Sequence, residues 1–280
     1  MSIRKAKSRM KADGYMKYRP MTEAQYRAAP GINKSTLWEL IRKSPAHYKY
    51  ALDNPTKDTP ALAFGRALHM AILQPEEFNR HYVIAPNVDR RTKEGREAYA
   101  QFMTDLNDRE AISVEDYHTI TEMYNTVYSD PDAAELLDGC QTEVPLFWTD
   151  PDTHIRCKCR LDAVKPGVIV DIKTAMDASP RAFRNAVLKF GYEVQTAHYM
   201  RGYKSQHDEP VKFYFIVIEK DPPYAINVVH APASVIDRGT YMLIDALEKL
   251  KECRKHRRWC GYGRTEIELN EWELIPDSDE

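Results

Sequence analysis

Apolar positions in the first half of the chain recur with helical spacing, three or four residues apart. This spacing predicts helices over residues 32–52, 61–73, 92–108 and 114–129. Asn33 or Ser35 is the expected N-cap of the first helix, and Ser44-Pro45 is expected to break it. A further turn of helix is predicted to start at Pro75. The first half of the chain is therefore expected to be helical, including a polar helical insertion ahead of a sheet.

The second half of the chain alternates between extended and helical patterns. Strands are predicted over residues 142–149, 154–163, 167–173, 211–219 and 224–230, and helices over residues 180–191, 195–205 and 233–258. The segment 211–219 is almost entirely apolar, as expected for a strand covered on both faces. Helices and strands in this order predict an α/β fold with a mixed central sheet flanked by helices.

Charge is segregated along the chain, so the formal net charge of −2 hides strongly charged segments. Residues 1–19 are basic, residues 251–258 form a second basic cluster, and the end of the chain is acidic. We expect a basic segment over 1–19, a single domain over 20–262 and an acidic tail over 263–280. Basic clusters suit contacts with phosphates that do not depend on sequence, although solvated chain ends explain the first segment equally well.

Cysteine usage and hydropathy set the expected compartment. Cys157 and Cys159 lie on one side of the same predicted strand, where a disulfide between them is unfavourable. Cys253 and Cys260 are the two cysteines that follow farther downstream, and we expect no iron-sulfur cluster. No apolar run reaches about 18 residues, and no signal peptide opens the sequence. We expect a reduced, cytoplasmic protein without contact with a membrane.

The tripeptide Asp171-Ile172-Lys173 ends an apolar strand and carries the main chemical signal. Residues two apart on a strand share a face, so Asp171 and Lys173 are expected to face one site while Ile172 points into the core. A carboxylate beside an ammonium group suits phosphodiester chemistry. The alternative interpretation is a solvated strand end, because this tripeptide is common.

A second carboxylate, Asp162, lies on the polar face of the preceding strand. The turn Lys165-Pro166-Gly167 joins the two strands and is expected to bring Asp162 close to Asp171. Two converging carboxylates and a lysine form a candidate Mg²⁺ site, because hard divalent cations prefer oxygen ligands. Mn²⁺ is expected to substitute.

Two helices contribute further candidates. His69 follows Gly65 by one turn on the predicted helix 61–73, and the small residue leaves room for a backbone or a ligand near the imidazole. The alternative is an ordinary histidine of the core. Gln195 and Tyr199 lie four residues apart on one helix face, which is also typical of an ordinary helix surface.

The order of these motifs resembles the RecB-like branch of the PD-(D/E)XK nuclease superfamily. Within that branch the chain is most similar to the nuclease domains of the RecE-type exonuclease VIII family, over roughly residues 20–260. Besides the residues above, the resemblance rests on the segments 44–49, 64–69, 191–195 and 213–219. It implies a restriction-endonuclease-like core.

The resemblance assigns a role to each motif. His69, Asp162, Asp171 and the main-chain carbonyl of Ile172 would be metal ligands, and Lys173 would be the catalytic lysine. Gln195 and Tyr199 would support the site or contact the DNA backbone. The family often has Glu where Asp171 stands, a change that keeps the ligand chemistry. Glu143 is a further candidate acid, although an exposed strand glutamate is the favoured interpretation of that residue.

Function follows from the same resemblance. It implies a phage-type, Mg²⁺-dependent exonuclease that degrades duplex DNA from the 5′ end and leaves 3′ single strands for homologous recombination. It also implies a ring-shaped homo-oligomer, for which a tetramer is one candidate, and a partner protein that anneals single strands. The alternatives are an endonuclease or accessory nuclease of another RecB-like branch, and a DNA-binding module without catalysis.

Basic residues near the predicted site are candidates for holding the DNA end. They are Lys158, Arg160, Arg181 and Arg184. Ordinary surface solvation is the alternative for each of them.

Overall fold

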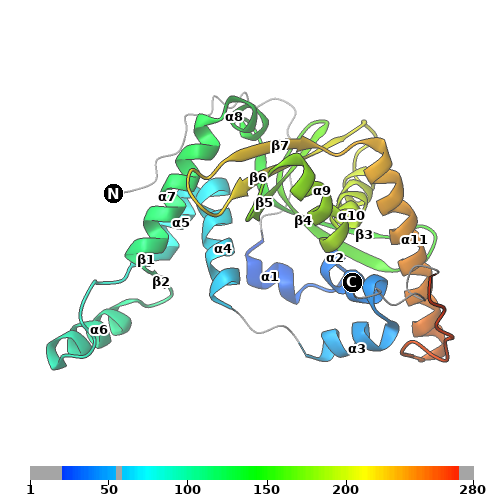
Figure 1. The fold of residues 1–280 in the computed structure, drawn as a ribbon, viewed down its shortest axis with the longest axis horizontal. Helices are drawn as coiled ribbons and strands as arrows, with labels where there is room; N and C mark the ends of the chain where they lie inside the picture. Colours follow the sequence, from blue (N-terminus) through cyan, green and yellow to red (C-terminus); the bar gives the residue numbers. More distant parts are fainter. Residues whose placement is uncertain (1–20, 55–58, 271–280) are drawn as a thin grey trace, which may run out of the picture.

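A mixed five-stranded sheet organises the molecule (Figure 1). The computed structural model describes residues 21–54 and 59–270. The strands follow the order β3-β4-β5-β6-β7. Their bounds are β3 Gln141–Thr149, β4 Arg156–Lys165, β5 Val168–Ala175, β6 Lys212–Glu219 and β7 Ile226–His230. The mixed sheet predicted from the sequence is therefore confirmed.

Strand pairing follows the turns that the sequence contains. β3, β4 and β5 form an antiparallel meander, and β6 pairs with β7 as the predicted hairpin. β5 and β6 are parallel, so the chain must cross over between them. The crossover consists of the helices α9 (Pro180–Phe190) and α10 (Tyr192–Lys204).

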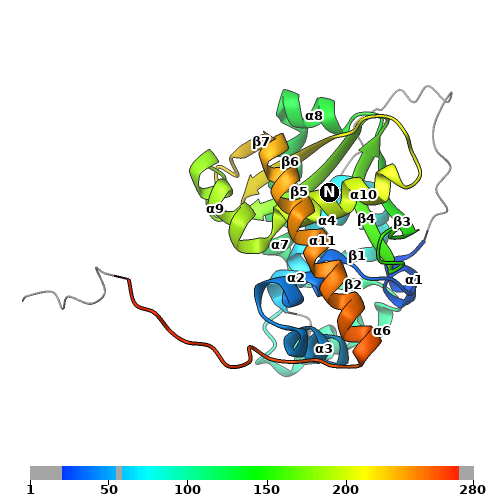
Figure 2. The same ribbon diagram turned by 90° about the vertical axis from the view of Figure 1, so that its right-hand side faces the viewer.

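Helices cover both faces of the sheet. One hydrophobic cluster joins a sheet face to residues of α2 (Lys34–Arg42), α3 (Pro45–Asp53), α9, α10 and α11 (Ala233–His256). The other cluster joins the opposite face to α4 (Pro60–Leu73), α5 (Pro75–His81), α7 (Val114–Ser129) and α8 (Pro131–Leu137). In Figure 2 the long helix α11 crosses in front of α10 and the sheet. The result is a three-layer α/β/α arrangement.

Capping residues fix the ends of the helices that lead into the site. The Asn33 side chain accepts a hydrogen bond from the Thr36 amide, and Ser44 and Ser179 cap α3 and α9 in the same way. Gly191 ends α9 in the left-handed conformation, with φ 66°, that glycine adopts without strain. The predicted break at Ser44-Pro45 and the predicted end at Gly191 are confirmed.

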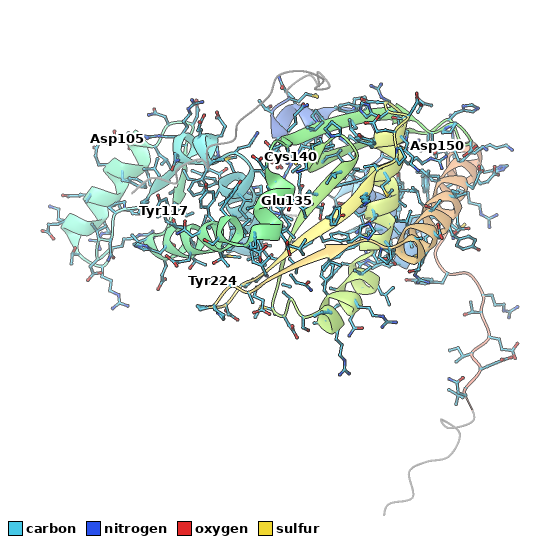
Figure 3. The ribbon with its side chains drawn as sticks, turned by 90° about the horizontal axis from the view of Figure 1, so that it is seen from above. Asp105, Tyr117, Glu135, Cys140, Asp150 and Tyr224 are labelled. Carbon is cyan, nitrogen blue, oxygen red and sulfur yellow. The ribbon has the colours of Figure 1, made fainter. Side chains whose placement is uncertain are left out.

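Some short elements were not predicted. They are α1 (Glu23–Ala28), α8 and a small parallel sheet of β1 (Tyr82–Ile84) and β2 (Glu110–Ile112). Each is too short for hydrophobic periodicity to be read reliably. The helix α6 (Lys93–Asp105) follows β1 and lies away from the sheet. Figure 3 shows Asp105, which ends α6, and Asp150, which follows β3, on opposite sides of the molecule.

The charged ends of the chain are only partly within the described residues. The basic segment 1–19 lies outside them, as do residues 271–280 of the acidic tail. Residues 263–270 are exposed and extend away from the helices in Figure 2. Within residues 21–54 and 59–270, no helix combines the length and apolar character needed to span a bilayer.

Candidate active site

The site forms where β4 and β5 separate. Their pairing runs from the turn as far as Ala163 opposite Val170, and the next residues along the two strands are Asp162 and Asp171. Asp162 Oδ2 accepts a hydrogen bond of 2.8 Å from the Ile172 amide. The tight turn therefore brings the two acidic residues together at the point predicted from the sequence, and a side chain replaces the main-chain ladder there.

Asp171 and Lys173 face the helix layer that contains α10. Lys173 forms an ion pair with Asp171, and Gln195 donates a 2.5 Å hydrogen bond to Asp171 Oδ1. The Asp171 side chain is only 1% exposed, and Ile172 is buried among the residues of the opposite cluster. The alternation predicted for this tripeptide is confirmed, and the solvated strand end is excluded.

His69 approaches from the other helix layer, on α4. Its Nδ1 lies 3.6 Å from Asp162 Oδ2, and 30% of the His69 side chain is exposed. A Cβ atom at Gly65 would meet no heavy atom within 4 Å, so no other backbone approaches the helix there. His69 is therefore a residue that lines a cavity, and the alternative of a fully buried core histidine is wrong.

Glu143 joins His69 and Asp162 in one cluster of possible ligand atoms. Within the described parts of the chain, one ligand atom from each of these residues lies within 4.8 Å of the other two. The Glu143 side chain is 15% exposed, so the interpretation as an exposed strand glutamate is wrong. Glu143 has φ 55°, a left-handed conformation that is uncommon for residues other than glycine. Asp171 does not belong to this cluster.

Arg160 lies beside this cluster. Its Nε is 2.6 Å from Glu143 Oε2, and its Nη2 is 3.2 Å from Glu23 Oε2 on α1. The guanidinium also lies over the Tyr26 ring, 5.5 Å from its centroid. Arg160 is therefore held on three sides next to the candidate ligands.

Lys158 does not face the site as predicted. It is 5% exposed, and its ammonium group donates hydrogen bonds to the carbonyls of Tyr26, Arg27 and Ala29. The prediction that Lys158 contacts DNA is therefore wrong, because its ammonium group is bonded to the carbonyls at the end of α1. The alternation along the strand predicted that Lys158 lies on the polar face, but the local sequence does not show that α1 covers this position.

A cavity of about 460 Å³ contains the predicted residues together with others. His69, Asp162, Asp171, Ile172, Lys173, Gln195 and Tyr199 all line it. The remaining lining residues were not predicted, apart from Arg160: Tyr26, Asn33, Lys34, Ser35, Cys159, Thr174 and Tyr192. The segment Asn33–Ser35 stands at the start of α2, where the sequence predicted a helix cap but no residue of the site.

Lys34 adds a second ammonium group to this cavity. Its Nζ donates a 2.5 Å hydrogen bond to the Phe190 carbonyl and lies 5.1 Å from the Trp38 ring centroid. Tyr192 lies between the two lysines, with Lys34 Nζ 5.8 Å and Lys173 Nζ 4.8 Å from its ring centroid. Burial, followed by the positive charge of Lys173, lowers the pKa of Lys34 to about 8.

Burial controls the protonation of the central groups. It lowers the pKa of His69 to about 4, and the charge of Lys173 acts in the same direction, so the imidazole is neutral at pH 7. Burial raises the pKa of Asp171 to about 6 despite the nearby Lys173. Burial opposes the charged form of Lys173, yet Asp171 and Asp162 outweigh it and raise the pKa of Lys173. At neutral pH the site therefore contains a neutral His69 imidazole, an ionised Asp171 and a charged Lys173.

The other two basic candidates lie outside the cavity. Arg181 and Arg184 are exposed residues of α9, and neither lines the cavity. Their role in binding DNA stays a prediction.

Comparison with known families identifies the domain type. A family model described as "PDDEXK-like domain of unknown function (DUF3799)" matches residues 35–269. A crystal structure from Eubacterium rectale, named "Putative exonuclease", is similar with a TM-score of 0.57 and 14% identity, covering 92% of this chain and 99% of that chain. The structure named SSO0001 has a TM-score of 0.29 and 15% identity, covering 67% of this chain and 85% of that chain, and carries no argument. Comparison with curated proteins gives no match.

Proposed function

We propose that this chain, which belongs to the PDDEXK-like DUF3799 family, is a deoxyribonuclease that depends on a divalent metal ion. More specifically, it would degrade duplex DNA from the 5′ end and leave 3′ single strands. The name of the Eubacterium rectale protein is consistent with an exonuclease. The 5′ polarity and the link to recombination rest on the resemblance of the sequence to RecE-type nucleases.

One observation carries the proposal. Gln195 from α10 and His69 from α4, on opposite faces of the sheet, meet the strand residues Asp162, Asp171 and Lys173 in one cavity. Acids, an imidazole and ammonium groups that line one cavity are not needed for the stability of the fold. A buried pair of charges is often no more stable than an apolar substitute, so its presence argues for chemistry.

The donor set fits a divalent metal ion. Neutral imidazole and carboxylate oxygens are ligands for Mn²⁺ and Mg²⁺, and His69 is neutral at pH 7. His69, Asp162, Asp171 and the Ile172 carbonyl would hold the ion, as the resemblance implies. When bound, such an ion lowers the pKa of water and offsets the charge of a scissile phosphate.

The side chains around the cavity each have a task in the proposed reaction. Lys173, whose ammonium group pairs with Asp171, would stabilise the negative charge that develops on the phosphate. Gln195 fixes Asp171 through its amide and leaves that carboxylate oriented. Lys34 offers a second positive charge to the DNA backbone.

A time course with end-labelled linear duplex tests the proposal. We expect degradation with Mg²⁺ or Mn²⁺ and none with EDTA. A 5′ label should be released as short products at the earliest times, whereas a 3′ label should stay on long single strands. Covalently closed circular DNA should remain intact.

The alternatives predict different results in the same assay. Cleavage of the closed circle would replace the exonuclease by an endonuclease. Intact linear and circular DNA, combined with no Mn²⁺ binding in calorimetry, would leave only a DNA-binding module. Early release of the 3′ label would show the opposite polarity, while the assignment as a nuclease would stand.

Assembly and partners belong to the same proposal. From the resemblance we propose a ring-shaped homo-oligomer around the duplex and a partner protein that anneals single strands. From the cysteine usage and hydropathy of the sequence we propose a cytoplasmic setting. Light scattering of the purified chain would measure the number of subunits. If the chain were monomeric at micromolar concentration and fully active, the proposal of a ring would be contradicted.

A further inference from the structure

Glu143 occupies an unusual place in this site. It is a glutamate in a strand, yet its backbone is left-handed and its side chain turns toward His69 and Asp162. Its own partner in the structure is Arg160 Nε at 2.6 Å. The resemblance names His69, Asp162, Asp171 and the Ile172 carbonyl as ligands, and the sequence offered Glu143 only as a further candidate acid near the metal site.

The three residues provide the ligand types that a divalent cation of the first transition series prefers. One imidazole nitrogen and two carboxylate oxygens lie within 4.8 Å of one another, which is close enough for one ion to contact all three. The charge of Asp162 disfavours the charged form of Glu143, and Arg160 supplies a positive charge beside Glu143 that offsets it. We infer that Glu143 is a metal ligand together with His69 and Asp162, and that Arg160 is the counter-ion that a bound cation displaces from Glu143.

Glu23 makes this inference testable, because it contacts the same guanidinium from outside the cluster. Arg160 Nη2 lies 3.2 Å from Glu23 Oε2 on α1, and Glu23 does not belong to the cluster of His69, Glu143 and Asp162. A ligand and a remote partner of Arg160 should therefore behave differently when their charge is removed. This inference rests on the proposed function only in requiring that the site binds a metal ion.

Calorimetric titration of the full chain with Mn²⁺, at constant pH and without DNA, provides the test. Glu143→Gln should weaken Mn²⁺ binding by about ten- to a hundredfold, because a charged ligand becomes neutral. Arg160→Gln should strengthen binding, because the competing positive charge is gone. Glu23→Gln should change the affinity by no more than about fivefold, the range of a partly exposed ion pair.

Mn²⁺ affinity should fall in Glu143→Gln and rise in Arg160→Gln. Two residues with only a structural role would not change the affinity in opposite directions. Unchanged Mn²⁺ affinity in Glu143→Gln, or weaker binding in Arg160→Gln, would overturn the inference and leave the nuclease proposal standing. Absence of Mn²⁺ binding in the unmodified chain would overturn both. If Glu143→Gln does not fold, Glu143→Asn serves instead, because asparagine adopts left-handed backbone with less strain.

Discussion

At the scale of single residues, the environment of each side chain decides its chemistry. Lys173 and Lys34 line the same cavity, yet their pKa values shift in opposite directions. Lys173 touches Asp171 and has Asp162 nearby, so its charged form is favoured. Lys34 is half-buried, and its partial desolvation together with the charge of Lys173 disfavours its charged form. The two lysines should therefore contribute differently to binding and to catalysis.

Removal of the Lys173 charge should affect the reaction more than the binding of DNA. We expect Lys173→Met to lower the rate of duplex degradation by at least about a hundredfold, because the charge acts on the developing transition state. Affinity for duplex in EDTA should change little. Lys212→Met, at an exposed position of β6, is the matched control and should degrade DNA at the normal rate. A Lys173→Met rate near that of the control would remove Lys173 from the catalytic set.

Lys34 should make DNA binding depend on pH. With a pKa of about 8, it is charged below pH 8 and loses its charge as the pH rises through that value. Duplex affinity in EDTA, measured by fluorescence anisotropy, should therefore fall by about three- to tenfold from pH 7 to pH 9. Arginine stays charged over this range, so Lys34→Arg should flatten the profile. The same slope in both proteins would exclude Lys34 as its source.

At the scale of elements, close packing of α10 against α11 positions Gln195. A Cβ atom at Gly239 of α11 would lie 1.9 Å from the Glu193 carbonyl oxygen of α10. Glycine is therefore needed for the two helix backbones to approach this closely. Glu193 stands two residues before Gln195, so the same contact sets the place from which Gln195 reaches Asp171.

The glycines of α11 and α4 should respond oppositely to the same substitution. We expect Gly239→Ala to destabilise the fold by about 2–4 kcal/mol, because the helices must separate. Gly65→Ala should stabilise it by about 0.5–1 kcal/mol, because the position is helical and a Cβ there meets open space. Urea unfolding followed by circular dichroism would measure both values. Equal effects of the two changes would contradict the close approach of α10 and α11.

At the scale of the whole molecule, the fold stabilises a site that is unfavourable by itself. Burial raises the pKa of Asp162 and, with the help of Asp162, that of Glu143, so their charged forms cost stability at pH 7. His69 comes from one helix layer and Gln195 from the other, and the two hydrophobic clusters hold both layers against the sheet. The free energy gained by packing the two hydrophobic clusters exceeds the electrostatic free energy lost by burying the acids next to each other.

Neutralising Asp162 should therefore stabilise the chain and remove its response to metal. In EDTA we expect Asp162→Asn to raise the melting temperature by about 2–4 °C, because an amide still accepts the Ile172 hydrogen bond without a buried charge. Mn²⁺ should raise the melting temperature of the unmodified chain and leave that of the variant unchanged. Scanning calorimetry with and without Mn²⁺ would measure both effects. A Mn²⁺ response retained by Asp162→Asn would argue against Asp162 as a ligand.

Local patterns in the sequence determined most of the elements and the central motif. The alternation around Asp171 and Lys173, the short turn after Asp162 and the caps at Asn33, Ser44 and Gly191 depend on neighbouring residues. Strand geometry and turn chemistry act over a few residues, so their consequences follow from the sequence alone. The placement of Gln195 and Tyr199 on one helix face likewise follows from their spacing of four residues.

Only the tertiary structure decided which distant residues share the cavity. Lys34 at the start of α2 and Arg160 on β4 line the cavity because separate layers pack around the point where β4 and β5 part. Glu143 on β3 lies beside them through its contacts with Arg160 and with the His69–Asp162 pair. The same packing takes Lys158 out of the site by placing the end of α1 over it. Contacts between distant segments follow from how whole elements fill space against one another, and periodicity along the chain does not encode them.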